Sequence, residues 1–159
     1  MDAAQTFREA MARLAAGVAV VTARRDDGHP CGLVATSVSS FSATPPSLLV
    51  SVAHTSRCYE ALASGEAFGV HVLAADQEPL AHVFAGLGAD KFAGLEWDWD
   101  DGVPRIEGAL SYLRCKRSAL FEMYDHSVLV GDVTGGKVRG GDPLVYMARS
   151  MGWRLGPAG

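Results

Sequence analysis

The stretch GLVATSVSSFSATPPSLLVS (residues 32–51) is the part of the sequence around which the rest of the chain is arranged. It begins with strand-like apolar residues, continues as a run of small hydroxyl side chains, is interrupted by Pro45 and Pro46, and returns to an apolar strand. Hydroxyl and backbone N–H groups can lie close to a flat polar ring or a phosphate without adding bulk or charge. The alternative is a serine-rich connection between two strands, and composition alone favours neither interpretation.

Length and charge exclude several protein classes. The chain has 159 residues, which predicts one domain that can bury a core without disulfides or metal ions. The hydrophobic fraction of 48% and the charged fraction of 20% are ordinary for a globular protein. The net charge is −4 and no basic cluster exceeds two or three residues, so nucleic acid is not an expected partner.

The cysteines and the apolar runs of the sequence indicate the cellular compartment in which we expect the protein. Cys31, Cys58 and Cys115 are far apart and form no CxxC pair, so they support neither a zinc ribbon nor a dithiol redox centre. We expect them to be reduced thiols in a cytoplasmic protein. The N-terminus is charged and unlike a signal peptide, and no apolar run reaches the roughly 18 residues that span a membrane. No membrane partner is therefore expected.

Periodicity divides the chain into an N-terminal helix and a strand-rich body. Phe7, Met11 and Leu14 recur at helical spacing and predict a helix over 3–16 that ends at Gly17. Asp27-Gly28 marks a hairpin turn. Shorter helices are expected over 55–63 and 76–84, an exposed acidic connection over 97–102, and strands over 18–23, 31–38, 48–53, 67–73, 110–121, 127–137 and 143–148.

Strands that do not alternate regularly with helices predict a mainly β fold, an antiparallel barrel with peripheral helices. We expect a single domain over 1–159. It would consist of the N-terminal helix over 1–16, the barrel with its helices over 17–155, and a tail over 156–159.

The order of residues in the 32–51 stretch resembles the signature of the short-chain flavin reductase family, the reductase components of two-component flavin monooxygenases. The family's usual form is Gly-x-Thr-Ala-x-Ser-x-x-Ser-Val-Ser-x-x-Pro-Pro-x-x-Leu-Val, and the resemblance extends over residues 7–154. It implies a flavin-binding split barrel that binds FMN or FAD and is built as a homodimer.

The resemblance also implies where the flavin ring is held. Backbone groups of the hydroxyl-rich segment are expected to contact the polar edge of the ring, and the end of the next strand is expected to flank the ring and ribityl chain. The first segment is Ala35, Thr36, Ser37 and Val38, and the second is Ser51, Val52 and Ala53. The alternative is that Thr36 and Ser37 only satisfy loop backbone.

Two further segments are candidates for the flavin phosphate. Ser56 and Arg57 open a predicted helix, where a hydroxyl, N–H groups and a guanidinium together form an anion site. Many relatives have Ser-Arg-Thr here, whereas this chain has Cys58 in third place. The alternative is helix capping by Ser56 with a solvated Arg57. Asp-Lys-Phe-Ala-Gly over 90–94 matches a family motif in which the cation, here Lys91, approaches the phosphate and the aromatic residue, Phe92, packs the cofactor.

The hydride-donor site is expected around His126. The segment over 124–133 resembles the family's Gly-Asp-His-x-x-x-x-Gly-Glu-Val, in which the histidine lies beside the nicotinamide and the exposed face of the flavin. His126 is therefore the candidate catalytic residue, able to donate to the carboxamide or the flavin edge. The alternative is a turn histidine that caps its strand beside Asp125.

The C-terminal strand and the remaining histidines complete the candidates. The segment over 143–149 matches the family's Pro-Leu-x-Tyr/Phe-x-x-Arg, which assigns Tyr146 and Arg149 to the pyridine nucleotide site. Relatives often have an aromatic residue at the position of Met151, and the nearest aromatic residue here is Trp153. No metal spacing is present. His71 reads as a satisfied core residue, and His54 as a weak phosphate or adenine contact.

The resemblance implies an NAD(P)H:flavin oxidoreductase that passes hydride from NADH or NADPH to FMN or FAD. The reduced flavin would then diffuse to a separate monooxygenase component. The alternative is a flavin-binding electron-carrier or storage module without reductase turnover. A split-barrel protein for haem or deazaflavin is a third interpretation, against which the matches over 36–39 and 90–92 argue.

Overall fold

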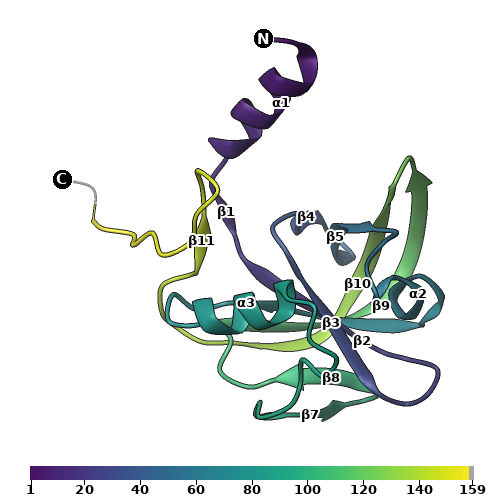
Figure 1. Cartoon of the computed structure of the whole chain (residues 1–159). Helices are drawn as coiled ribbons and strands as arrows, with labels where there is room; N and C mark the ends of the chain where they lie inside the picture. Colours follow the sequence, from purple (N-terminus) through teal and green to yellow (C-terminus); the bar gives the residue numbers. More distant parts are fainter. Residues whose placement is uncertain (158–159) are drawn as a thin grey trace.

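The computed structural model describes residues 1–157 and shows a strongly twisted antiparallel sheet with helices at its periphery (Figure 1). Of the predicted tail, residues 158 and 159 lie outside the described part. The helices are α1 (Ala3–Ala12), α2 (Tyr59–Ser64) and α3 (Glu78–Ala85). The strands are β1 (Ala16–Gly17), β2 (Ala19–Arg24), β3 (Pro30–Ala35), β4 (Ser39–Ala43), β5 (Pro46–Ala53), β6 (Ala67–Val72), β7 (Trp97–Asp100), β8 (Val103–Ile106), β9 (Ser111–Met123), β10 (His126–Val138) and β11 (Val145–Tyr146).

The main sheet has seven strands in the order β3-β2-β6-β9-β10-β5-β4, every neighbouring pair antiparallel. The prediction of a mainly β, antiparallel fold is confirmed. In residues 1–157 no ladder joins the edge strands β3 and β4, although β3 and β5 approach each other. The sheet thus curves towards a barrel that stays open between β3 and β5.

The core occupies both faces of the central strands. β2 is rich in β-branched and small residues, which suit a strand buried on both sides, and its first five residues are buried. One cluster packs against α2 through Ala61 and Leu62, and the other packs against α3 through Ala81 and Phe84. The two short helices therefore cover opposite parts of the sheet.

His71 lies inside this core, as predicted. It is fully buried, its Nε2 accepts a hydrogen bond from the Ile106 N–H (3.0 Å), and its Nδ1 donates to the Val20 carbonyl (3.1 Å). Burial lowers the pKa of His71 to about 4, so the ring is neutral in the folded protein.

The predicted N-terminal helix over 3–16 is too long. Asp2 caps α1 by accepting from the Gln5 N–H (2.7 Å), and the helix ends at Ala12. Ala16 and Gly17 instead form β1, because they pair with Tyr146 and Val145 of β11. None of the α1 residues is buried, and Figure 1 shows α1 projecting away from the sheet.

Two other local predictions are wrong. The segment over 97–102 is mostly exposed, as predicted, but it is not a connection: it forms β7 and the turn to β8, and the Trp97 ring packs edge-on against Phe92 at 5.2 Å. The helix predicted over 55–63 begins later, since α2 starts at Tyr59 and its N-cap, Cys58, makes no side-chain cap.

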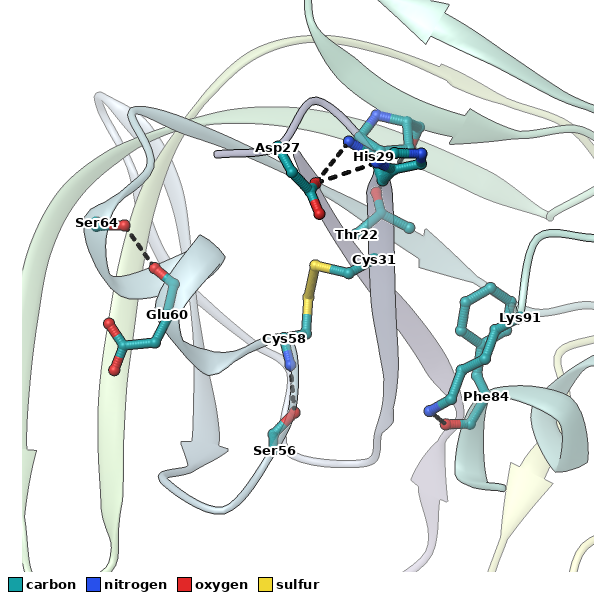
Figure 2. The surroundings of a disulfide bond; sticks show 11 residues. Thr22, Asp27, His29, Cys31, Ser56, Cys58, Glu60, Ser64, Phe84 and Lys91 are labelled. Atoms are coloured by element: carbon teal, nitrogen blue, oxygen red, sulfur yellow. Dashed lines mark hydrogen bonds and ion pairs between the residues drawn. A yellow bond between two sulfur atoms is a disulfide. The ribbon is translucent and has the colours of Figure 1, made fainter. Parts of the chain in front are cut away.

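The cysteines differ most from expectation, since Cys31 and Cys58 form a disulfide rather than two free thiols (Figure 2). Their Cα atoms are 5.6 Å apart, within the range that disulfides require. They are separated by 27 positions in sequence, so only the tertiary fold brings them together. Cys115 is the free, buried cysteine, and burial raises its pKa to about 12. In residues 1–157, no helix has the length and apolar character needed to cross a membrane.

Candidate functional site

The hydroxyl-rich segment links β3 to β4 and is tied to β5 by one side chain. The Ser37 hydroxyl donates to the Ser51 carbonyl and accepts from the Ser51 N–H, both at 3.1 Å. These bonds bridge the opening between β3 and β5. The structure therefore brings together the two segments predicted to hold the flavin ring, and we call residues 35–38 with residues 51–53 the ring cradle.

The ring cradle offers free backbone donors. Ala35 ends β3 and is buried, whereas Thr36 and Ser37 are exposed and Val38 is half-buried. In the described chain, the N–H groups of Thr36, Ser37 and Val38 have no hydrogen-bond partner. Backbone N–H groups are obligatory donors, so these three are available to the carbonyl and nitrogen acceptors of a polar ring edge.

His126 lies at the end of the ring cradle. It is the first residue of β10 and pairs in register with Ala53, the last residue of β5. Its side chain is about half exposed, and its Nδ1 lies 2.8 Å from Asp125 Oδ1. The hydrogen bond to His126 lowers the pKa of Asp125, which keeps this carboxylate ionised. Asp125 thus accepts from Nδ1 and leaves Nε2 as the ring nitrogen available to a ligand. The contact with Asp125 is the one that the turn-capping alternative expects, and the catalytic role of His126 stays a prediction.

A buried hydroxyl supports this end of the sheet. Ser127 follows His126 and is fully buried, and its Oγ lies 2.9 Å from His54 Nε2 and 2.8 Å from the Tyr59 hydroxyl. The His54 N–H donates to the Asp125 carbonyl at 2.9 Å. These bonds connect β5, α2 and the β9–β10 turn. His54 Nε2 is engaged by Ser127, and the contact of His54 with phosphate or adenine stays a prediction.

A second group of side chains forms what we call the anion pocket, between β3, the turn before α2 and the loop after α3. Its charged and hydroxyl-bearing lining residues are Arg25, Ser56, Arg57, Asp90 and Lys91. Arg57 Nη2 donates to the Gly88 carbonyl at 3.0 Å, and Lys91 Nζ donates to the Phe84 carbonyl at 2.7 Å. Both long side chains are therefore held at the pocket by backbone acceptors.

Electrostatics of the anion pocket indicate a missing negative partner. Partial burial, and then repulsion from Arg57 and Arg25, lower the pKa of Lys91. The Arg25 Nε is buried and, among residues 1–157, lacks a hydrogen-bond partner. Asp90 is the acidic lining residue, and its Oδ1 accepts from the N–H groups of Phe92 and Ala93 (3.0 and 3.1 Å). Clustered cations with an unused donor fit a phosphate group, which accepts several charge-assisted bonds.

The anion pocket differs from its sequence-based description in two ways. α2 has six residues and starts three positions after Ser56, so side chains rather than a helix N-terminus form the site. The Ser56 hydroxyl accepts from the Cys58 N–H at 3.2 Å, a local turn contact. Sequence reasoning missed Arg25, which no motif marks. The Arg25 N–H bonds to the His29 carbonyl at 2.9 Å, so the hairpin between β2 and β3 delivers its side chain to the pocket.

The remaining predicted residues lie elsewhere. Phe92 is buried in the core, edge-on to Phe84 at 5.3 Å, and forms the floor beside Lys91. Tyr146 belongs to the β1–β11 ribbon, and Arg149 Nη2 lies 3.2 Å from Glu9 Oε1 of α1. In the described part of one chain, neither residue bonds to the ring cradle or the anion pocket.

Comparison with known proteins gives a consistent result. A flavin reductase like domain matches residues 11–153. An NADH:riboflavin 5'-phosphate oxidoreductase of Streptomyces pristinaespiralis is 42% identical over 141 residues, covering 87% of this chain and 79% of that protein. The reductase component of a 4-nitrophenol 4-monooxygenase/4-nitrocatechol 2-monooxygenase of Rhodococcus opacus is 35% identical over 146 residues, 92% of this chain and 78% of that protein. The structure of Streptomyces globisporus NADH:FAD oxidoreductase SgcE6 with NAD and FAD fragments superposes with a TM-score of 0.89 at 28% identity, covering 98% of this chain and 94% of that one.

Proposed function

Because the chain belongs to the flavin reductase-like family, we propose that it transfers hydride from NADH to FMN or FAD and supplies the reduced flavin to a separate monooxygenase. The observation that carries this proposal is the placement of the anion pocket and the ring cradle on neighbouring turns of one chain. Arg57 and Ser56 of the pocket follow Ala53 of the cradle by only three or four residues.

Each group has a defined task in this proposal. Arg25, Arg57 and Lys91 bind the flavin phosphate, and the N–H groups of residues 36–38 orient the polar edge of the ring. When bound, the flavin supplies the N5 atom that accepts hydride from C4 of the nicotinamide. His126 donates from its ring to the carboxamide or the flavin edge as negative charge develops, with Asp125 fixing the imidazole.

Exposure of the ring cradle accounts for release of the product. Thr36, Ser37 and His126 all lie at the surface, and a reduced flavin must leave to reach another protein. Binding is therefore expected to be exchangeable.

The oligomer and the compartment belong to the same proposal. α1 exposes Phe7 (63% accessible) and Met11 (47%), and Leu14, two residues after the helix ends, is also 63% accessible. Such an apolar surface is usually covered. We expect a second copy to cover it, which gives a homodimer measurable by light scattering after size-exclusion chromatography. Tyr146 and Arg149 stay proposed contacts of the nicotinamide, next to α1. The cytoplasm, where NADH is supplied, stays the proposed compartment.

Turnover distinguishes a reductase from an electron carrier. Oxidation of NADH in air is followed with a small amount of protein and a large excess of FMN or FAD. A reductase oxidises many equivalents of NADH per protein chain, and the rate rises with flavin concentration until it saturates. Oxidation that stops after one equivalent per chain would instead support the carrier or storage module. NADPH in place of NADH tests the donor.

A further inference from the structure

The disulfide is part of the wall of the anion pocket. Cys31 and Cys58 both line it, together with Arg25, Arg57 and Lys91. In Figure 2 the bridge runs from β3 to the turn before α2, with Ser56 below it and Lys91 across from β3. Both cysteines are almost fully buried, with exposed fractions of 4% and 2%.

The bridge joins the two segments that carry the arginines. Cys31 follows the hairpin that the Arg25 N–H closes on His29, and Cys58 directly follows Arg57. Apart from this bond, the turn before α2 is held by short-range contacts such as the Cys58 N–H to Ser56 Oγ and by Arg57 on Gly88. The disulfide is therefore the covalent constraint on the separation of the two guanidinium groups.

The disulfide acts against the mutual repulsion of the cationic side chains that line the anion pocket. Partial burial, and then repulsion from Arg57 and Arg25, lower the pKa of Lys91, and the three cations line one pocket, so their mutual repulsion favours a wider separation of the side chains. A covalent link across the pocket opposes that spreading and keeps the donors converged on one point. Preorganised donors bind an anion more tightly than donors that must first be brought together.

We propose that Cys31 and Cys58 form a reversible thiol–disulfide site that sets the affinity of the anion pocket, an inference that rests on the proposed flavin phosphate site. A dithiol supplies two electrons and two protons: the Cys31–Cys58 bond breaks, both sulfurs become thiols, and the dithiol closes to its own disulfide. The disulfide form is the tight-binding state and the dithiol form the weak one. In the return step a small-molecule disulfide accepts the two electrons and two protons and leaves as two thiols while the Cys31–Cys58 bond re-forms. In the proposed cytoplasmic setting lasting disulfides are uncommon, so the bond would follow the supply of such an oxidant.

Occupancy of the pocket should protect the bond in return. Both cysteines are buried and line the anion pocket, so a phosphate bound there blocks the approach of a dithiol through it. Linkage requires the same coupling in both directions: if oxidation tightens flavin binding, then bound flavin stabilises the oxidised form.

The test measures FMN dissociation constants by quenching of flavin fluorescence, for protein oxidised with a disulfide reagent and for protein reduced with dithiothreitol and freed of it under anaerobic conditions. We expect reduction to weaken FMN binding about tenfold, equal to about 1.4 kcal/mol. Riboflavin, which has no phosphate, should bind both forms equally. Alkylation in denaturant followed by mass analysis should trap three thiols in the reduced form and one, that of Cys115, in the oxidised form.

Two variants complete the test. The double variant C31S/C58S should bind FMN as weakly as the reduced wild type, with or without dithiothreitol. Cys115→Ala should still bind FMN more tightly when oxidised than when reduced. If the double variant does not fold, the reduced wild type serves in its place. Equal FMN affinities of the two forms, with NADH oxidation retained, would overturn the switch but not the reductase. If neither form bound FMN, the assignment of the pocket to flavin would fail as well.

Discussion

At the scale of single residues, charge without a partner supports the proposed phosphate site more directly than the motif does. Among the described residues neither Arg25 nor Arg57 forms an ion pair, although the two line the same pocket. The motif singled out Arg57, but only the three-dimensional structure identified Arg25.

We expect Arg57→Ala and Arg25→Met each to weaken FMN binding by about tenfold to a hundredfold, because each removes a charge-assisted bond worth about 1.5–3 kcal/mol. Affinity for riboflavin should change little, since it has no phosphate. Arg24→Met is the matched control: it removes the same charge from the adjacent position, where the guanidinium lies over the Trp99 ring at 5.5 Å. An unchanged FMN dissociation constant in both pocket variants would refute the site.

His126 should matter for the reaction more than for binding. We expect His126→Ala to lower kcat about tenfold or more, while the FMN dissociation constant changes by less than about threefold. The reason is that the variant removes one hydrogen-bond donor, which acts on the negative charge that develops during hydride transfer. His82→Ala removes another exposed histidine paired with a carboxylate, 3.3 Å from Glu78 on α3, and should leave both constants unchanged. If His126→Ala kept the wild-type kcat, His126 would not have the proposed role in hydride transfer.

At the scale of elements, the pairing of β10 with β5 positions the site, and Gly131 makes it possible. Gly131 lies at an irregularity in the β9–β10 ladder, and a Cβ there would overlap the Phe68 ring and lie 2.9 Å from the Cβ of Cys115. The glycine of the His126 motif therefore has a packing role, because the core ring occupies the space of its missing side chain.

Gly131→Ala should lower the free energy of unfolding by about 1–3 kcal/mol, the usual cost of overpacking a core. Gly140→Ala is the control, since a Cβ at Gly140 has no neighbour within 4 Å. Urea denaturation of both variants measures the difference. Equal stability of the two would show that β10 shifts without cost.

At the scale of the whole molecule, local patterns predicted what depends on neighbours in sequence. Runs of β-branched residues located β2, β5 and β10, and Asp27-Gly28 located a hairpin. Long-range partners were not predictable. β1 exists because Tyr146 pairs with Ala16, and the disulfide exists because β3 passes the turn before α2. Arg25, Arg57 and Lys91 likewise come from separate segments, and only the three-dimensional structure places them in one pocket.

Global stability should depend on pH through His71. Its folded pKa of about 4 lies below its unfolded value of 6.5, so between these values the unfolded chain binds more protons and stability falls as pH falls. Lowering the pH from 7.5 to 4.5 should cost about 2–3 kcal/mol from this group, within the pH-dependent loss of the whole protein. His71→Gln, which cannot titrate there, should lose correspondingly less in urea denaturation at the two pH values. If the variant and the wild type lost the same free energy of unfolding between the two pH values, His71 would not contribute to the pH dependence of stability.

The convergence of Arg25, Arg57 and Lys91 on one small pocket also affects how the protein behaves in ordinary buffers. Inorganic phosphate or sulfate carries the charge that these side chains select, so either salt should compete with FMN and raise its apparent Michaelis constant. A reductase assayed in a phosphate buffer would then look like a poorer flavin binder than the same protein in a buffer without such anions.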